Sequence, residues 1–138
     1  MAGDNHRFEF RATLSDLEGG LDVLHASIDE LRKVLGRDAD DRALMFFETA
    51  VAEIGNNALL HGRVSPERPV QYVLHSDAET VVAWVLDSGP PVARHWVREM
   101  APPTSEAGRG LALARSMLDS LEYERRGQLN LWRLVKRL

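Results

Sequence analysis

The chain has 138 residues, a formal net charge of −4 and no cysteine. This length suits a single domain over residues 1–138 with a core of its own. Lys and Arg are scattered, so no basic stripe predicts direct binding of nucleic acid. The missing thiols exclude disulfides, thiolate metal sites and thiol catalysis. No apolar run approaches the ~20 residues that span a bilayer, and the N-terminus lacks the apolar stretch of a signal peptide. We therefore expect a cytoplasmic protein without a membrane partner.

The first half of the chain predicts a strand followed by two helices. HRFEFRAT at 6–13 alternates weakly between apolar and polar residues, which indicates an edge strand. The Ser-Asp pair at 15–16 offers N-caps for a helix through about residue 35, and Gly36 suits its C-cap. A second helix is expected from about Asp40 to His61. Its apolar residues recur every three or four positions: Leu44, Phe47, Val51, Ile54 and Ala58.

The second half predicts two hairpins separated by a loop and a helix. VQYVLHS (70–76) and TVVAWVLDSG (80–89) are β-rich runs joined by a short polar turn. Residues 88–110 are rich in Pro, Gly, Ala and Ser, and a loop this long is more often functional than idle. GLALARSMLDSL (110–121) predicts a third helix, and the remaining residues form a hairpin around Arg126-Gly127. The order β-α-α-β-β-α-β-β predicts an α+β sandwich with helices on one face of a mainly antiparallel sheet.

The middle helix carries a polar face that a purely structural helix does not need. Glu53, Asn57 and His61 are four residues apart and therefore share one side of the helix. A carboxylate at this place can act as general base, and an amide oxygen is a suitable ligand for Mg²⁺. The alternative is that Glu53 is solvated and the asparagines cap the end of the helix before Gly62.

Two further signals are weaker when taken alone. Asp87 ends an apolar strand, and Gly89 beside it permits a close backbone approach. Such an acid can accept a hydrogen bond from the exocyclic amine of adenine, although Asp-Ser-Gly is also common in ordinary turns. In AGRGLALARSML, Gly108 and Gly110 flank Arg109 at a helix start, where free N–H groups favour phosphate. A flexible loop that leads into a helix would explain the same glycine pattern.

The order and spacing of these signals resemble a known pattern. ExxxN on a helix, DxG after a strand and a loop that ends in GxG at a helix start are similar to the GHKL ATPase superfamily. Within it, AVAEIGNNALLHG and GRGLALARSMLDSLEYER look most like the small bacterial anti-sigma-factor serine/threonine kinases. The resemblance covers nearly the whole chain and implies the Bergerat fold, a two-layer α/β sandwich with a mixed, mostly antiparallel sheet and about three helices.

The resemblance also implies roles for individual residues. Glu53 matches the catalytic base and Asn57 the magnesium ligand. The residues that match the ATP-binding positions are Asn57, His61, Asp87, Gly89, Gly108, Arg109, Gly110 and Leu111. Residues 91–107 match the lid over ATP. The implied activity is ATP- and Mg²⁺-dependent phosphorylation of a serine on a small STAS-type antagonist, by a protein that also binds a sigma factor. The family commonly dimerises, which implies a homodimer.

One departure from the family pattern leaves an alternative open. The family often has DxGxG at the adenine motif, whereas this chain continues from Gly89 into Pro90 and Pro91. Two prolines remove N–H donors and fix the backbone. This difference motivates a second hypothesis, a GHKL-fold binding module with weak or no catalysis that sequesters a regulatory partner. The catalytic half of a sensor histidine kinase is a third reading, which would need a separate partner chain for the phosphoacceptor.

Overall fold

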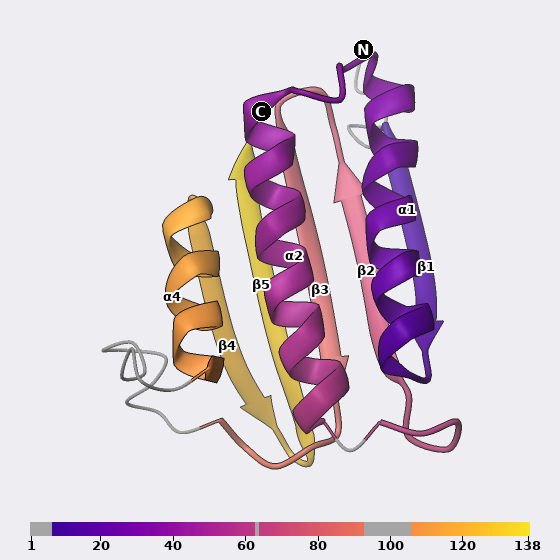
Figure 1. The fold of residues 1–138 in the computed structure, drawn as a ribbon, viewed down its shortest axis with the longest axis vertical. Coiled ribbons are helices and arrows are strands. Elements are labelled where there is room, and N and C mark those ends of the chain that lie inside the picture. Colours follow the sequence, from indigo (N-terminus) through magenta and orange to yellow (C-terminus); the bar gives the residue numbers. More distant parts are fainter. Residues whose placement is uncertain (1–6, 63, 93–105) are drawn as a thin grey trace.

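The computed structural model describes residues 7–62, 64–92 and 106–138. Its strands form a five-stranded sheet in the order β1-β2-β3-β5-β4 (Figure 1). Their bounds are β1 Phe8–Leu14, β2 Val70–Ser76, β3 Thr80–Asp87, β4 Ser120–Arg126 and β5 Leu129–Arg137. Every neighbouring pair in this sheet is antiparallel. The expected edge strand and both hairpins are confirmed, while the expected mixed sheet is, in the described strands, wholly antiparallel.

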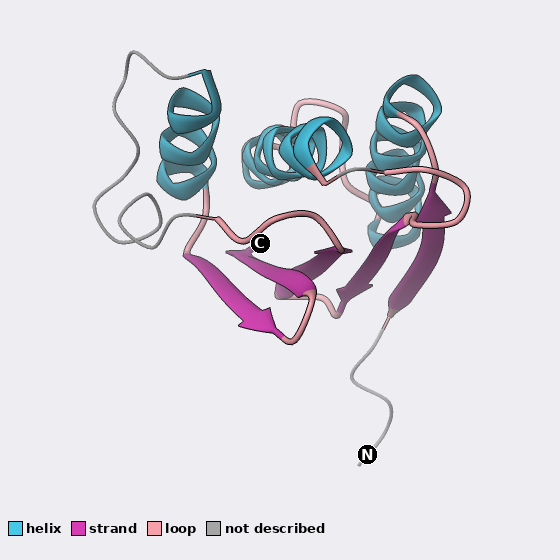
Figure 2. Cartoon of the chain, turned by 90° about the horizontal axis from the view of Figure 1, so that it is seen from below, coloured by secondary structure: helices cyan, strands magenta, loops and turns pink. Residues whose placement is uncertain are grey.

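The helices of the described chain all lie on one face of this sheet (Figure 2). They are α1 Leu17–Leu35, α2 Arg42–His61 and α4 Glu106–Met117. The predicted two-layer α+β architecture is therefore confirmed. None of the described helices is long and apolar enough to cross a membrane.

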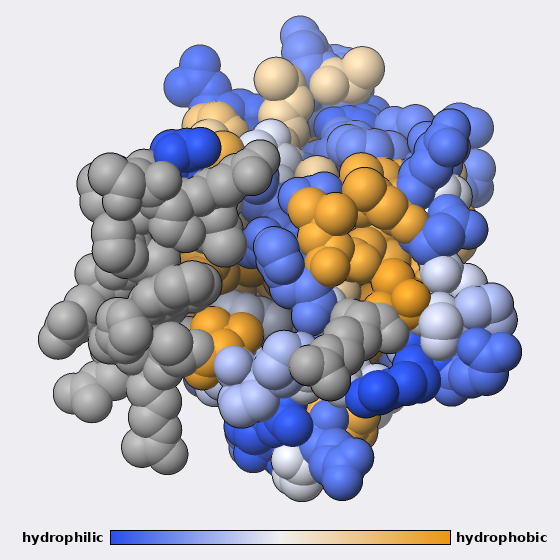
Figure 3. All heavy atoms as spheres, turned by 60° about the horizontal axis from the view of Figure 1, so that its bottom comes forward, coloured by the Kyte–Doolittle hydropathy of each residue, from blue (hydrophilic) through white to orange (hydrophobic). Residues whose placement is uncertain are grey.

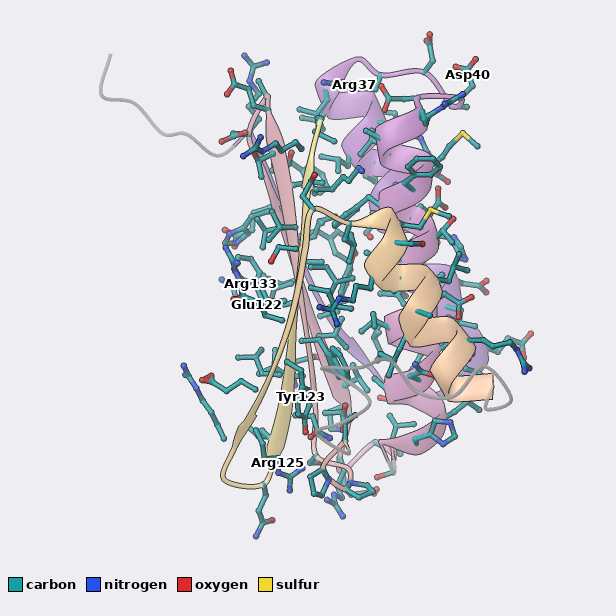
Figure 4. All side chains as sticks on the ribbon, turned by 90° about the vertical axis from the view of Figure 1, so that its left-hand side faces the viewer. Arg37, Asp40, Glu122, Tyr123, Arg125 and Arg133 are labelled. Carbon is teal, nitrogen blue, oxygen red and sulfur yellow. The ribbon has the colours of Figure 1, made fainter. Side chains whose placement is uncertain are left out.

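The strand sequences explain which side of the sheet is covered. In β5, the side chains of Asn130, Trp132 and Leu134 are buried, while the residues between them are more exposed. This alternation places every second residue against the helices. Figure 4 shows the same rule in β4, where Tyr123 points towards the helices and Glu122 points away. On that far face Glu122 pairs with Arg133 at 2.9 Å.

Glycines allow α1 and α2 to pack closely. A Cβ placed on Gly55 of α2 would lie 2.3 Å from Leu24 Cδ1, and one on Gly20 of α1 would lie 2.7 Å from Leu59 Cδ1. Each helix therefore offers a glycine to a leucine of the other. A methyl group at either glycine would force the facing leucine side chain to move, so both glycines allow the present close packing.

Polar contacts also define both ends of α1 and join it to α2. Asp16 is the N-cap of α1, and Gly36 ends it with a left-handed φ of 66°, as predicted. Between the helices, Glu48 of α2 binds Arg32 at 2.8 Å through one oxygen and His25 at 2.7 Å through the other. This ion-pair cluster positions α2, the helix that carries the polar face.

The third helix differs from the prediction by about one turn at each end. It begins at Glu106 rather than at residue 110, and it ends at Met117 rather than near residue 121. The early end has a clear cause, because Asp119 already joins the sheet. Its backbone N–H donates to the carbonyl of Val135, and its carboxylate accepts from the backbone N–H of Arg137.

Candidate functional site

The polar face of α2 lies at the end of the molecule where α2 and β3 finish and α4 begins, at the bottom of Figure 1. Glu53 and Asn57 are half-buried there, and His61 is exposed. Figure 3 looks onto this end, where apolar surface lies beside strongly hydrophilic side chains. The expected sharing of one helix face is confirmed by two adjoining cavities that both have Asn57 and His61 in their walls.

The two cavities differ in character. The inner cavity, of about 270 Å³, lies between α2, α4 and the sheet, and its lining is mostly apolar: Asn57, Ala58, His61, Gly62, Asp87, Pro90, Pro91, Val92, Leu111, Asn130 and Trp132. The outer cavity, of about 400 Å³, lies between α2 and α4 and is more polar: Glu53, Asn56, Asn57, Leu60, His61, Arg109, Gly110 and Leu113. Together they form a site with an apolar and a polar end.

Asp87 is the charged group of the inner cavity. It is the last of the buried, alternate residues of β3 and is only 5% exposed. Its Oδ1 accepts from the side-chain amide of Asn130 at 2.9 Å and from the backbone N–H of Gly89 at 2.8 Å. Among the described residues, Oδ2 has no hydrogen-bond partner. The carboxylate is thus held through one oxygen, and the other is left for a ligand that donates a hydrogen bond.

Two glycines bring the end of α2 against the turn that follows β3. A Cβ on Gly89 would lie 2.5 Å from Gly62 Cα and 2.9 Å from the carbonyl oxygen of His61. A Cβ on Gly62 would lie 3.0 Å from Cβ of Asp87. Gly89 is therefore needed for close backbone approach, as its position beside Asp87 predicted.

A glycine also brings α4 against the catalytic-base candidate. A Cβ on Gly110 would lie 2.9 Å from Glu53 Oε2 and 3.7 Å from Asn57 Nδ2. The next residue, Leu111, is 5% exposed and lines the inner cavity, while Arg109 is exposed and lines the outer one. All three lie in the first turns of α4.

Two further site predictions, for Gly108 and for the lid, fall partly outside the described residues. Gly108 lies near the start of α4, and its surroundings are outside the described residues. Of the expected lid, only Pro91 and Val92 are described on the near side, and both line the inner cavity. Within the described ranges, no group of three or more His, Asp or Glu side chains could hold a metal ion. A magnesium ion at Asn57 would therefore take most of its ligands from outside the protein.

Three site residues escaped the sequence reasoning, and all come from the last hairpin. Asn130 and Trp132 line the inner cavity, and Tyr123 bonds to Asn130 and to the backbone N–H of Val92. Trp132 belongs both to the core and to the cavity wall. Asn130 left a readable signal, because it is an amide in phase with buried Trp132 and Leu134. A polar residue at such a position needs a polar partner.

The sequence matches the model of the histidine kinase-like ATPase domain over residues 21–136. The comparison with curated proteins finds no match.

Among solved structures, the fold is similar to the nucleotide-free catalytic domain of histidine kinase ThkA, with a TM-score of 0.58 and 14% identity over 94% of each chain. It is also similar to histidine kinase AdeS of Acinetobacter baumannii, with a TM-score of 0.54 and 9% identity over 93% of this chain and 67% of that one. A third similar structure is the histidine kinase domain of a blue-light activated histidine kinase of Erythrobacter litoralis, with a TM-score of 0.54 and 19% identity over 92% of this chain and 65% of that one. At these identities the likeness concerns the fold alone, whereas the family match spans most of the sequence. The chain belongs to the family of histidine kinase-like ATPase domains.

Proposed function

We propose that this chain is an anti-sigma factor with ATP-dependent serine/threonine protein kinase activity. It phosphorylates a small STAS-type antagonist and exchanges that antagonist for a sigma factor, and it works as a homodimer. The observation that carries the proposal is the convergence of Glu53, Asn57, Asp87 and Gly110 on two adjoining cavities. The resemblance of the α2 and α4 sequences to anti-sigma-factor kinases supports the choice of substrate.

The inner cavity fits the adenine base. Ala58, Leu111 and Trp132 offer apolar surface to a flat ring, and Asp87 is the buried acceptor among them. Its Oδ2 would accept from the exocyclic amino group of adenine. Guanine presents a carbonyl oxygen at the corresponding place, and two acceptors would then face each other. A carboxylate oxygen that faces another acceptor loses its hydrogen bond, which makes that mismatch costly.

The outer cavity fits the phosphates and the reacting groups. Arg109 supplies positive charge for phosphate in this cavity. Asn57 would hold Mg²⁺ through its amide oxygen. When bound, the ion neutralises charge on the transferred phosphoryl group. Glu53 would take the proton of the attacking serine hydroxyl, since its carboxylate borders the same cavity.

Phosphate transfer tests the proposal directly. The purified chain with Mg²⁺ and ATP should move labelled γ-phosphate to a serine of the antagonist. Asn57→Ala should abolish this transfer, because the ion loses its protein ligand. Gln128→Ala is the matched control, since Gln128 is an exposed amide in the β4–β5 turn. Substantial transfer by Asn57→Ala would defeat the assignment. Sedimentation equilibrium of the same preparation would test the homodimer.

Pro90 and Pro91 favour a second candidate, a binding module that sequesters a partner without catalysis. Both prolines line the inner cavity, where the family often has a glycine. Titration calorimetry with ATP and ADP separates the two candidates. Binding of both nucleotides supports the kinase, and no heat of binding at millimolar nucleotide supports the module.

A further inference from the structure

The turn after β3 is held by side chains rather than by its own backbone. Pro90 and Pro91 have no N–H group, so this segment lacks two of the donors that would normally satisfy a turn. Three consecutive carbonyl oxygens instead accept hydrogen bonds from distant side chains. The pairs are Arg68 Nη2 to Ser88 at 2.5 Å, Arg125 Nη1 to Gly89 at 2.7 Å and Asn130 Nδ2 to Pro90 at 2.9 Å.

Asn130 has the central place among these donors. It is 2% exposed, lies opposite Asp87 in the β3–β5 register, and uses its amide nitrogen for both Asp87 Oδ1 and the Pro90 carbonyl. Its Oδ1 accepts from the Tyr123 hydroxyl at 2.5 Å and from Arg125 Nη1 at 3.1 Å. An amide has two N–H donors and two acceptor positions, and all four are used here.

These contacts require an amide and not merely a polar residue. The nitrogen of Asn130 faces a carboxylate and a carbonyl, which only accept, and its oxygen faces a hydroxyl and a guanidinium. An aspartate would point an oxygen at Asp87. The Tyr123 hydroxyl extends the network by accepting from the backbone N–H of Val92 at 3.0 Å. The network therefore joins the Asp87 carboxylate to the Pro90 carbonyl and to the backbone N–H of Val92.

We propose that Asn130 is a positioning residue for nucleotide recognition, which aims Asp87 Oδ2 into the inner cavity and, with Arg125 and Arg68, replaces the hydrogen bonds that Pro90 and Pro91 cannot make. This inference rests on the proposed nucleotide site. It adds that this chain has a preformed base pocket whose wall depends on the last hairpin. The proline pair, on this account, rigidifies the pocket instead of disabling it.

The variant Asn130→Asp tests the network, because it replaces only the amide NH₂ group with an oxygen. Its carboxyl group would lie beside that of Asp87, and two carboxylates this close cannot both ionise, so one pKa of the pair rises. The shared proton restores an O–H donor at low pH and is lost at high pH. The ionisable groups around the pair are His61 on α2, Arg125 and Tyr123 on β4, and Arg68 in the loop before β2.

The readout is the ratio of the dissociation constants of ADP for Asn130→Asp and for the wild type, measured at each pH. Contributions that do not involve the substituted side chain are common to both proteins and cancel in the ratio. We expect the ratio to be roughly tenfold or more near pH 8 and to fall towards one near pH 5.5. Gln128→Glu, the same amide-to-acid change at an exposed position of the same hairpin, should give a ratio near one throughout.

The outcomes separate this inference from the proposed function. If the wild-type chain binds no ADP, the proposed function fails and the inference fails with it. If the wild type binds but the Asn130→Asp ratio stays flat with pH or stays near one, the positioning role alone is overturned. Thermal unfolding of each variant at each pH shows whether the compared proteins are folded.

A second variant keeps the inference testable if Asn130→Asp does not fold. Tyr123→Phe removes the hydroxyl that joins Asn130 to Val92 and keeps the ring, which packs on Trp132 with centroids 4.8 Å apart. We expect ADP to bind roughly threefold to tenfold more weakly, with a smaller loss for GDP. An unchanged ADP affinity, or equal losses for ADP and GDP, would overturn the role of the network in base recognition.

Discussion

Helix α2 carries two glutamates five positions apart, and their surroundings differ sharply. Both oxygens of Glu48 are occupied, one by Arg32 and the other by His25 on α1. Glu53 has no hydrogen-bond or ion-pair partner within the described ranges, and its Oε2 lies against Gly110 beside the outer cavity. A carboxylate with both oxygens occupied joins two helices, whereas one left open beside a cavity is available for chemistry. The same side chain on the same helix thus occurs in a paired and an unpaired setting within the described residues.

The largest effect is expected from Glu53→Gln. The amide keeps the shape of the side chain but cannot take the proton of a serine hydroxyl, so phosphate transfer should fall roughly 10²- to 10⁴-fold. The affinity for ATP should stay within about threefold, since Glu53 does not line the inner cavity proposed for the base and, in the outer cavity, is assigned to the serine hydroxyl rather than to the phosphates. Single-turnover transfer and nucleotide titration measure the two quantities. Glu48→Gln is the matched control, and an equal loss of transfer in both variants would remove the distinction between the two glutamates.

For the free energy of unfolding, we expect the larger loss from Glu48→Gln and the smaller from Glu53→Gln. Glu48→Gln leaves Arg32, which is 9% exposed, with only the mostly exposed Asp29 among its described ion-pair partners. The uncompensated charge should lower the free energy of unfolding by about 2 kcal/mol. Glu53→Gln should change it by less than about 0.5 kcal/mol. Urea denaturation of both variants tests this, and a larger loss in Glu53→Gln would show that its carboxylate is a structural group after all.

Gly110→Ala tests the contact between Gly110 and the Glu53 carboxylate. The new methyl group would lie 2.9 Å from Oε2 and should push the flexible carboxylate aside, lowering transfer roughly tenfold. Alanine is the better helix former, so α4 should gain up to about 1 kcal/mol. Activity and stability should then move in opposite directions. In a Glu53→Gln background the same substitution should cost no further activity, and additive losses in the double variant would place its effect elsewhere.

The smallest effect concerns a third acid of α2, its N-cap Asp41. Burial would raise the pKa of Asp41, but the hydrogen bond from the backbone N–H of Leu44 and the guanidinium of Arg37 outweigh it and lower this pKa below its ordinary 3.8. The ionised form therefore stabilises the fold above that value, and its contribution is lost as pH falls through the lower folded pKa.

Asp41→Asn keeps a good cap and removes only the charge, so it should cost about 0.5 kcal/mol at neutral pH. The difference from the wild type should shrink as pH falls below 3.8 and vanish below the folded pKa of Asp41. Urea denaturation at several pH values measures it. A difference that persists in acid would assign the loss to cap geometry rather than to charge.

The sequence was most informative where a feature repeats locally. The apolar spacing of α2 predicted both its length and the common face of Glu53, Asn57 and His61, and the alternation in the hairpins predicted the strands. It failed at the start of α4, because glycines are poor helix formers and the helix was predicted to begin only at Gly110, with Gly108 in the preceding loop. Packing of α4 on α2 overrides that preference, and Gly110 is small because Glu53 lies against it.

Asn130 could not be placed from local pattern alone. Its contact with Asp87 joins residues 43 positions apart and depends on the pairing of β3 with β5, which are not consecutive strands. Nothing near Asp87 in the chain shows that an amide will lie opposite it. The prolines at 90 and 91 were equally ambiguous, since the donors that satisfy their turn come from three separate segments.

The contact between Gly62 and Gly89 has a mechanical consequence. With one backbone lying 2.5 Å from where the other's first side-chain atom would be, the tip of α2 and the corner beyond β3 cannot slide past each other. A side chain at either position would push the helix end away from that turn, and with it the wall that Gly62 and Asp87 contribute to the inner cavity.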